Sequence, residues 1–262
     1  MIPRVLTIAG SDPGGGAGIQ GDLKTFTAFR VYGLSVITAV TVQNTLGVRG
    51  VNPVAARLVA AQAEAVLADI GADAVKLGML ASPAIVKTAA RCLKKYAIKK
   101  IVLDPVMLAK DGRALLAENA VGALINELLP LALIVTPNAP EAARLAGVKV
   151  ETRADARRAA KIISGFGPRF VLVKGGHLPG KVCRDLLFDG SEFVEFSSPR
   201  LDTRNTHGTG CALSAAIAAC LALNLEPCAA VKEARLYLSG ALSNSFSLGG
   251  GCGPLNHFWR RG

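Results

Sequence analysis

The residues from Asn205 to Ala219 have the composition of an anion-binding loop followed by a helix. The first part, through Gly210, is small, polar and rich in glycine, which predicts a loop. The second part is rich in alanine and lacks a helix breaker, which predicts a helix that begins between Gly208 and Cys211. A glycine-rich turn that opens a helix presents unpaired backbone N–H groups and the positive end of the helix dipole, and both suit a phosphate. An ordinary helix cap fits this stretch equally well.

Cys211 places a thiol at the mouth of the predicted loop. The start of a helix lowers the pKa of a nearby thiol, so we expect this position to favour the thiolate, which is the reactive form. The structural alternative is a buried cysteine without chemical function.

Further polar side chains follow predicted strands. They are Thr41 to Thr45, Asp104, Thr136 to Glu141, and Lys174 to His177. Ligands of open parallel sheets bind at the carboxyl ends of the strands, so these groups are candidates for one site. From the residues alone, Asp104 also fits a surface carboxylate, Glu141 a helix cap, and Lys174 a solvated lysine.

A glycine-rich segment runs from Gly10 to Gly18 after the first predicted strand. Gly16, Gly18 and Gly21 satisfy the dinucleotide pattern G-x-G-x-x-G. Several loop residues separate this pattern from the strand, however, and the next strand does not end in the acidic residue that would hold a ribose. The segment therefore predicts a loop around a small ligand rather than around a dinucleotide.

Strands that alternate with helices predict an α/β fold with a doubly wound, mostly parallel sheet. The expected strands cover residues 4–9, 35–41, 74–76, 101–106 and 133–135, with another that begins at Phe170. The expected helices cover 19–29, 55–70, 83–96, 118–128, 153–164 and 229–246, and the second of them follows Asn52-Pro53. A β-hairpin of residues 185–188 and 193–196 should turn at Asp189-Gly190. Because no linker divides the chain, we expect one domain over residues 1–262.

The composition excludes several classes of protein. The 30 basic and 19 acidic residues give a net charge of +11, which attracts anions. The basic residues are dispersed and not interleaved with aromatic residues, so we expect a solvated basic surface and no nucleic-acid interface. Residues 205–225 lack charge, but their apolar part is shorter than the roughly 20 residues of a membrane helix, so we expect no membrane partner. The six cysteines have no metal-binding spacing, and the first residues do not resemble a signal peptide, so we expect a cytoplasmic protein.

Taken together, the ordered motifs resemble those of hydroxymethylpyrimidine/phosphomethylpyrimidine kinases. The resemblance covers essentially the whole chain, and the order and spacing of the motifs carry it. The matching segments are Thr7 to Pro13, Gly15 to Gln20, Gln43 to Thr45, Asp104 to Met107, Thr136 to Asn138, Lys174 to His177, Asn205 to Cys211 and Gly253 to Phe258.

The resemblance implies a three-layer αβα, ribokinase-like fold and a kinase of thiamine biosynthesis. Members of this family phosphorylate 4-amino-5-hydroxymethyl-2-methylpyrimidine and then its monophosphate, with ATP and Mg²⁺. A homodimer is also implied.

The matching positions imply roles for individual residues in phosphoryl transfer. Backbone N–H groups of Gly208, Thr209 and Gly210 would hold the transferring phosphoryl group, and Lys174 would bind phosphate. Asp104 and Glu141 would hold Mg²⁺ through water, with Asn138 beside the nucleotide. Cys211 stands where ribokinase relatives carry an aspartate base. Because the transition state of phosphoryl transfer is loose, we expect a moderate effect when this thiol is removed.

For the pyrimidine, Gln43 offers one donor and one acceptor to an aminopyrimidine edge. Other positions match residues that line the ring pocket in the family: Gly10, Asp22, Thr41, Met79 and Val106. We interpret His207 and His177 as hydrogen-bonding residues that shape loops rather than as bases, and we assign no role to His257.

Two other functions compete with this interpretation. Pyridoxal kinase activity occurs on the same fold with a similar anion loop, although Gln43 and the segment from Gly10 to Gly18 favour the aminopyrimidine. A ligand-binding regulator without catalysis is the second alternative. The presence of Asp104, Glu141, Lys174 and Cys211 together argues against it.

Overall fold

A computed structural model describes residues 2–108 and 112–260 of the chain, and its described residues form one sheet of nine strands. The strand order is β3-β2-β1-β4-β5-β6-β7-β8-β9. Neighbouring strands from β2 through β1 to β7 are parallel, whereas β3 at one edge and β8 and β9 at the other are antiparallel to their neighbours. The strands are β1 (Arg4–Ser11), β2 (Tyr32–Asn44), β3 (Gly47–Pro53), β4 (Ala74–Leu77), β5 (Ile101–Leu103), β6 (Ile134–Val135), β7 (Phe170–Val173), β8 (Val182–Phe188) and β9 (Phe193–Pro199).

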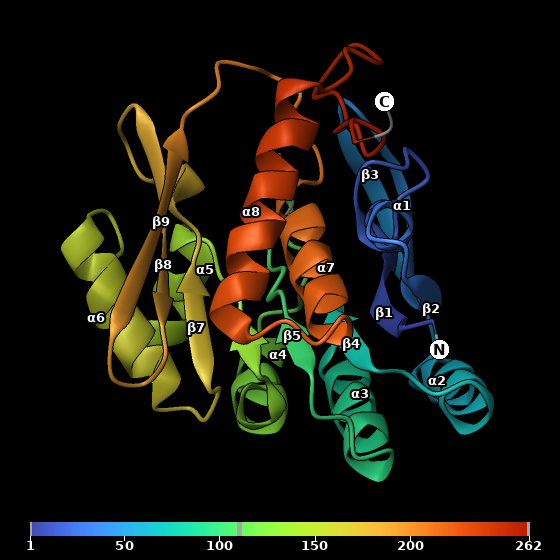
Figure 1. The fold of residues 1–262 in the computed structure, drawn as a ribbon. Helices are drawn as coiled ribbons and strands as arrows, with labels where there is room; N and C mark the ends of the chain where they lie inside the picture. Colours follow the sequence, from blue (N-terminus) through green and yellow to red (C-terminus); the bar gives the residue numbers. More distant parts are fainter. Residues whose placement is uncertain (1, 109–111, 261–262) are drawn as a thin grey trace.

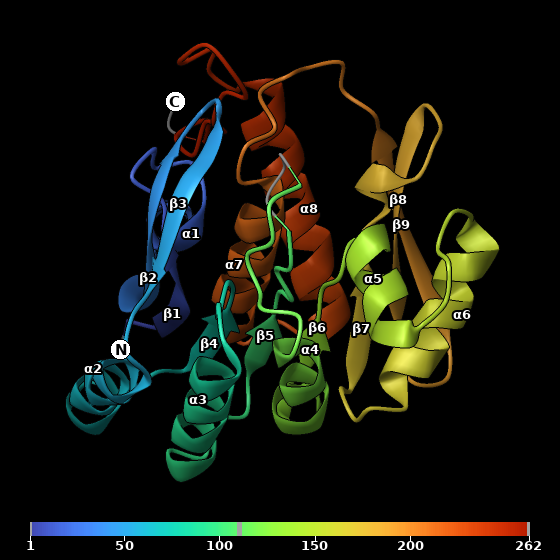
Figure 2. The same ribbon diagram turned by 180° about the vertical axis from the view of Figure 1, so that it is seen from behind.

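Helices cover both faces of this sheet (Figures 1 and 2). One face carries α1 (Gly18–Ala28), α7 (Thr209–Ala222) and α8 (Pro227–Ser243). The opposite face carries α2 (Ala56–Asp69), α3 (Pro83–Lys95), α4 (Ala120–Ala123), α5 (Ala139–Ala146) and α6 (Arg153–Ser164). The predicted mostly parallel sheet and three-layer αβα arrangement are confirmed.

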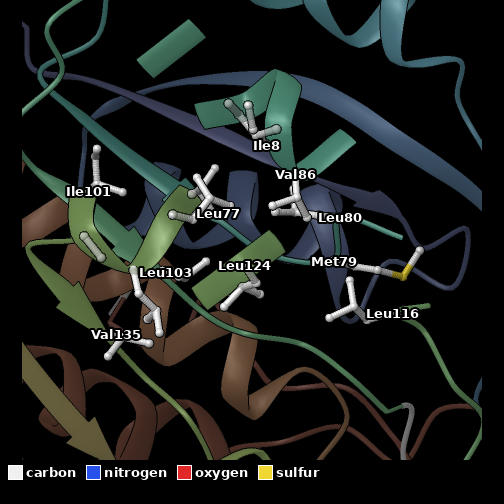
Figure 3. Close-up of a cluster of buried hydrophobic side chains, with 14 of the residues drawn as sticks. Ile8, Leu77, Met79, Leu80, Val86, Ile101, Leu103, Leu116, Leu124 and Val135 are labelled. Carbon is white, nitrogen blue, oxygen red and sulfur yellow. The ribbon is translucent and has the colours of Figure 1, made fainter. Parts of the chain in front are cut away.

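Alternation along the central strands supplies two apolar cores. Successive side chains of a strand point to opposite faces, and in β5 Ile101 and Leu103 face one core while Val102 faces the other. Figure 3 shows part of the first core, which includes Ile101, Leu103, Leu124 and Val135. Burial on both faces explains why β5, β6 and β7 are apolar without interruption.

Local signals fix several helix boundaries. Helix α6 begins and ends at the predicted residues, because Thr152 and Asp155 form a capping box at its start. The Ser82 side chain caps α3, and Pro83 occupies the first turn of that helix. The predicted hairpin at Asp189-Gly190 is also confirmed, with strands β8 and β9 longer than expected.

Three elements differ from the prediction. Residues Gly47–Pro53 form strand β3 antiparallel to β2, where the sequence predicted no strand, and α5 (Ala139–Ala146) was not among the predicted helices. The helix after Pro53 starts at Ala56, one residue from its predicted start. The single helix expected over residues 118–128 is a short α4 followed by a π-helical turn, η1 (Leu124–Leu128), and a 3₁₀ turn, η2 (Leu129–Leu131). Pro130 prevents regular continuation, because it lacks a backbone N–H.

Within residues 2–108 and 112–260, no helix has the length and apolar character that a membrane crossing requires.

Candidate active site

The loop before α7 has the predicted geometry of an anion-binding helix start. Gly208 is the N-cap residue with φ of 82°, and α7 begins at Thr209. The His207 N–H donates to the carbonyl oxygen of Gly253 at 3.1 Å, so the carboxyl-terminal segment braces the loop. Helix α7 thus begins within the predicted range, and the Thr209 N–H donates to the Thr206 carbonyl oxygen at 3.4 Å. That this helix start binds an anion stays a prediction.

The two glycine-rich segments of the chain touch at this point. A Cβ atom at Gly208 would overlap the carbonyl oxygen of Gly16, and a Cβ atom at Gly16 would overlap the His207 ring. The left-handed φ of Gly208 also disfavours any residue with a side chain. The loop before α1 and the loop before α7 therefore fit together only with glycine at both positions.

Three charged side chains from neighbouring strand ends meet beneath the α7 start. Lys174 Nζ lies 2.6 Å from Asp104 Oδ1 and 3.8 Å from Glu141 Oε2. A Cβ atom at Gly210 would lie 3.4 Å from Lys174 Nζ and 3.8 Å from Asp104 Oδ2. Strands β5, β6 and β7 are adjacent in the sheet, which explains why residues 70 positions apart meet here.

The charges of this cluster depend on one another. Burial alone would raise the pKa of Asp104, but Lys174 and Lys76 outweigh it and hold the pKa of that carboxyl below its ordinary value. Burial alone would lower the pKa of Lys174, but Asp104 and Glu141 raise it. The pKa of Glu141 is raised to about 7, because burial and the Asp104 charge outweigh the attraction of Lys174.

Glu141 helps to cap helix α5 and also belongs to the charged cluster. Its side chain accepts from the Asn138 N–H at 2.8 Å, and the Asn138 side chain accepts from the Glu141 N–H at 2.9 Å. This capping box at the start of α5 confirms the structural role that the sequence left open. The cap also holds the Glu141 carboxyl beside Lys174, so the two roles are compatible.

Asp104 and Glu141 fit a magnesium ion held partly by substrate phosphates. Mg²⁺ in such sites takes one or two carboxylates and completes its shell with water and phosphate oxygens. Thr136 and Ser214 hydroxyls donate to Asp104 at 3.1 and 3.3 Å and fix its orientation. Within the described part of the chain, no group of three or more His, Cys, Asp and Glu side chains is placed to hold a metal ion.

The expectation that the helix start favours a Cys211 thiolate is wrong. Burial raises the pKa of the thiol to about 11, and the neighbouring Lys76 charge and a hydrogen bond from the Gly18 backbone only partly oppose it. Burial is the largest of these effects, and the neighbouring charges of Asp22 and Asp104 act in the same direction. Cys211 is therefore a neutral thiol at neutral pH.

Asp22 is fully buried in α1, where it pairs with a lysine. Its carboxylate lies 2.8 Å from Lys76 Nζ, and neither side chain is exposed to solvent. Thr7 donates to the same carboxylate at 2.6 Å. Burial alone would lower the pKa of Lys76, but Asp22 raises it, so the lysine is charged. These contacts give Asp22 a structural role, and its predicted contact with a ring stays a prediction.

Met79 and Thr41, two of the remaining predicted ring residues, contact the carboxyl end of β1, which contains Gly10. A Cβ atom at Gly10 would lie 2.9 Å from Met79 Cε, so the Met79 side chain covers this glycine. Thr41 donates to the Ser11 carbonyl oxygen at 2.8 Å, and half-buried Gln43 lies two residues further along β2. Val106, partly exposed, lies two residues beyond Asp104.

The three histidines have different surroundings. His207 Nε2 lies 2.8 Å from Asp12 Oδ2, which agrees with the predicted loop-shaping hydrogen bond. His177 ends η3 (Gly175–His177), the 3₁₀ turn after Lys174. His257 is buried with its Nδ1 atom 2.8 Å from the Tyr237 hydroxyl, and burial lowers its pKa to about 4.

Sequence reasoning did not identify Lys76 and gave Asp12 no role. A lysine within the apolar run Ala74-Val75-Lys76-Leu77 was the available signal, since a buried lysine requires a partner. Asp12 accepts backbone N–H groups of Gly14, Gly16 and Ala17. An aspartate before a glycine run is the usual signal of such a turn.

Comparisons with known proteins identify relatives over nearly the whole chain. Residues 12–256 match the family described as phosphomethylpyrimidine kinase. The hydroxymethylpyrimidine/phosphomethylpyrimidine kinase of Rhizobium meliloti is 51% identical over 263 residues, which cover 99% of this chain and 98% of that protein.

Solved structures share the fold over most or all of the chain. A phosphomethylpyrimidine kinase from Clostridium difficile has a TM-score of 0.82 at 45% identity, over 92% of this chain and 99% of that one. The ADP complex of Bacillus subtilis pyridoxal kinase has a TM-score of 0.92 at 37% identity, over 100% of this chain and 99% of that one. The extent of these matches, together with the anion loop and its charged cluster, places the chain in the phosphomethylpyrimidine kinase family.

Proposed function

We infer that the chain is a hydroxymethylpyrimidine/phosphomethylpyrimidine kinase, a phosphotransferase of thiamine biosynthesis. The observation that carries this inference is the meeting of Lys174, Asp104 and Glu141 beneath the glycine-rich start of α7. Phosphoryl transfer requires positioning and charge stabilisation more than covalent chemistry. A helix start above a lysine and two carboxylates supplies both.

ATP is the phosphoryl donor in this proposal. The N–H groups of Gly208, Thr209 and Gly210 would surround the transferring group, and Lys174 would contact its oxygens. Asp104 and Glu141 are the carboxylates that would hold Mg²⁺ through water, and the ion would supply positive charge to the phosphates. Asn138 keeps Glu141 in place through the capping box.

The neutral Cys211 thiol would orient the acceptor hydroxymethyl group by a hydrogen bond. It does not need to remove a proton before the transfer, because a loose transition state leaves the hydroxyl proton in place until late. Removal of the thiol should therefore lower kcat moderately, without abolishing activity.

Gln43 would pair with the amino group and adjacent ring nitrogen of the pyrimidine. Gly10, Thr41, Met79 and Val106 would complete the ring pocket, with Asp22 beside them. A single domain of residues 1–262 would carry the whole site.

Pyridoxal phosphorylation is the second candidate, because a solved pyridoxal kinase shares the fold with a TM-score of 0.92. Its identity of 37% is lower than the 51% shared with the pyrimidine kinase of Rhizobium meliloti. The donor and acceptor of Gln43 also suit an aminopyrimidine edge. We therefore favour the pyrimidine over pyridoxal as the substrate.

A cytoplasmic homodimer is part of the proposal. Val40, Val42 and Leu46 of the β2–β3 edge are 54%, 62% and 64% exposed, which is unusual for a row of apolar side chains. A second copy of the chain would cover them. Light scattering of the purified protein tests this assembly independently of activity.

The activity is tested with purified protein, ATP and Mg²⁺, comparing hydroxymethylpyrimidine, its monophosphate and pyridoxal. We expect both pyrimidines to be phosphorylated and Lys174→Ala to lower kcat/KM strongly with the fold retained. A preference for pyridoxal would reverse the order of the two candidates. Tight binding of the pyrimidine without turnover would indicate a regulator.

A further inference from the structure

The backbone of Lys174 lies where strand β7 ends and the chain turns away from the sheet. The pairing of β7 with β8 extends to Val173, which lies opposite Leu186. After Lys174 the chain enters the 3₁₀ turn η3. On the side of the segment that follows β6, the Lys174 N–H donates to the Pro137 carbonyl oxygen at 2.8 Å. A backbone that leaves a sheet in this way needs further hydrogen bonds to hold it.

A buried carboxylate of β8 supplies the hydrogen bond on the other side. The Gly175 N–H donates to Asp185 Oδ1 at 2.7 Å. A Cβ atom at Gly175 would overlap the Arg184 carbonyl oxygen, so this glycine lies directly against the backbone of β8. A hydrogen bond from a backbone N–H to a carboxylate is about twice as strong as one between neutral groups. Asp185 therefore fixes the residue that directly follows Lys174.

Asp185 is itself held by an arginine of α8. Its second oxygen, Oδ2, accepts from Arg235 Nη1, and the same guanidinium donates through Nη2 to Ser198 Oγ at 2.9 Å. The side chains of Asp185 and Arg235 are only 7% and 10% exposed. A carboxylate buried to this extent requires a partner, since an uncompensated buried charge is strongly destabilising. Arg235 thus keeps the carboxylate in place between α8 and Gly175.

These contacts connect helix α8 to the charged cluster of the candidate site. They run from Arg235 through Asp185 to the Gly175 N–H, and the preceding residue is Lys174, whose Nζ lies 2.6 Å from Asp104 Oδ1. A lysine carries its charge on a flexible four-carbon stem, so the position of its ammonium group depends on where its backbone is held. A shift of Gly175 would therefore move this ammonium group relative to Asp104.

We propose that Asp185 and Arg235 are positioning residues for Lys174 in phosphoryl transfer. This inference rests on the proposed function, in which Lys174 contacts the oxygens of the transferring group. The two residues act through the backbone at Lys174 rather than on the substrate. Displacement of a reacting group by about 1 Å can lower a rate about a hundredfold, so a carboxylate outside the charged cluster controls the rate of transfer.

The first test compares kcat and KM of the unmodified protein with those of Asp185→Ala. We expect kcat to fall by about tenfold to a hundredfold. The KM for hydroxymethylpyrimidine should stay nearly unchanged, because the predicted ring residues Thr41 and Gln43 belong to β2, which β1, β4, β5 and β6 separate from β7. Glu195→Gln is the matched control, because it weakens an ion pair of the same hairpin, 3.0 Å from Arg184, without altering the contact of Asp185 with Gly175.

A cycle with Lys174→Ala separates positioning from a general loss of structure. If Asp185 acts through Lys174, Asp185→Ala should change kcat/KM by less than about twofold once residue 174 is already alanine. If Asp185 only stabilises the fold, the two losses multiply, and the proposal is overturned. Should Lys174→Ala turn over too slowly for this comparison, the dissociation constants of ATP without acceptor, measured by calorimetry, form the same cycle.

Two further variants separate the position of the carboxylate from its charge. Asp185→Glu retains the charge, but its longer side chain cannot hold Gly175 in the same place, so kcat should fall by about tenfold or more. Asp185→Asn combined with Arg235→Met removes both charges and keeps an oxygen that can accept the Gly175 N–H, so it should retain more of kcat than Asp185→Glu. The reverse order would overturn the positioning role. If Asp185→Ala does not fold, Asp185→Glu takes its place in the cycle.

The proposed function and this inference fail in different ways. An unmodified protein that phosphorylates neither pyrimidine overturns the proposed function. An active protein whose kcat changes by less than about twofold in Asp185→Ala, with the fold retained, overturns the positioning role and leaves the proposed function intact.

Discussion

The reactivity of Cys211 is decided by burial rather than by its position at a helix start. Its pKa of about 11 leaves the thiolate a small minority at neutral pH, and the thiolate fraction rises with pH. We therefore expect slow alkylation of Cys211 by iodoacetamide at neutral pH, with a rate that keeps increasing up to about pH 11. Mass spectrometry of labelled peptides measures this rate, and exposed Cys228 provides an internal standard. A Cys211 rate that reaches its plateau near neutral pH would contradict the assignment of a neutral thiol.

Glu141 makes stability depend on pH in a direction set by its raised pKa. The native carboxyl holds its proton up to about pH 7, whereas the unfolded carboxyl loses it near 4.5. Between these values the native state binds more protons, so the free energy of unfolding should fall as the pH rises. Glu141→Gln should remove this dependence while it keeps the capping box, since glutamine also serves at that position.

Urea unfolding at several pH values, without Mg²⁺ or nucleotide, measures the effect of Glu141. Asp155→Asn is a suitable control, because half-buried Asp155 also caps a helix but has a pKa below its ordinary value. If Glu141→Gln shows the same fall in stability between pH 4.5 and 7 as the unmodified protein, the raised pKa of Glu141 is excluded.

A single added methyl group should disturb the contact between the two glycine-rich loops and lower both stability and activity. Gly208→Ala would place a Cβ atom on the Gly16 carbonyl oxygen and would also strain the backbone at φ of 82°. We expect a loss of about 1–3 kcal/mol in the free energy of unfolding. Activity should fall further than stability, because the loop that holds phosphate moves. Gly122→Ala in α4, where a Cβ atom meets nothing within 4 Å, should leave both quantities nearly unchanged.

Elements with strong local signals could be predicted from the sequence, and those that depend on distant partners could not. Helix α6 was predicted to the residue, because Thr152 caps it and its apolar residues recur with helical spacing. Strand β3 was missed, because its residues Gly-Val-Arg-Gly-Val-Asn-Pro are poor strand formers and form a strand by pairing with β2. The local amino-acid sequence does not indicate that these residues pair with β2.

The same distinction applies to the site. Asp104, Glu141 and Lys174 could be predicted because each follows a strand, and the carboxyl ends of parallel strands share one edge. The pairing of Asp22 with Lys76 could not be predicted, because it joins a residue of helix α1 to a residue of strand β4 that lies 54 positions further along the chain. The prediction of a Cys211 thiolate was wrong for a related reason, because the burial that raises the pKa of this thiol is a property of the folded molecule.

The buried pair of Asp22 and Lys76 joins the helix layer that contains α1 to the central sheet. Neither side chain is exposed, so removal of one partner leaves an uncompensated buried charge. Lys76→Met should therefore lower the free energy of unfolding by about 3–5 kcal/mol. Asp22→Asn combined with Lys76→Met removes both charges and leaves a carboxamide oxygen that can still accept from Thr7.

We expect the double variant to recover most of the stability lost in Lys76→Met, because a neutral pair does not require compensation for lost hydration. The midpoints of urea unfolding for both single variants and the double variant form the cycle that measures this coupling. Losses that simply add would mean that the two charges do not depend on each other. A double variant that recovers the loss would show that each charge is tolerated at this buried position only while the other is present. Lys76 also acts on the thiol at the start of α7, whose pKa it lowers against the effect of burial.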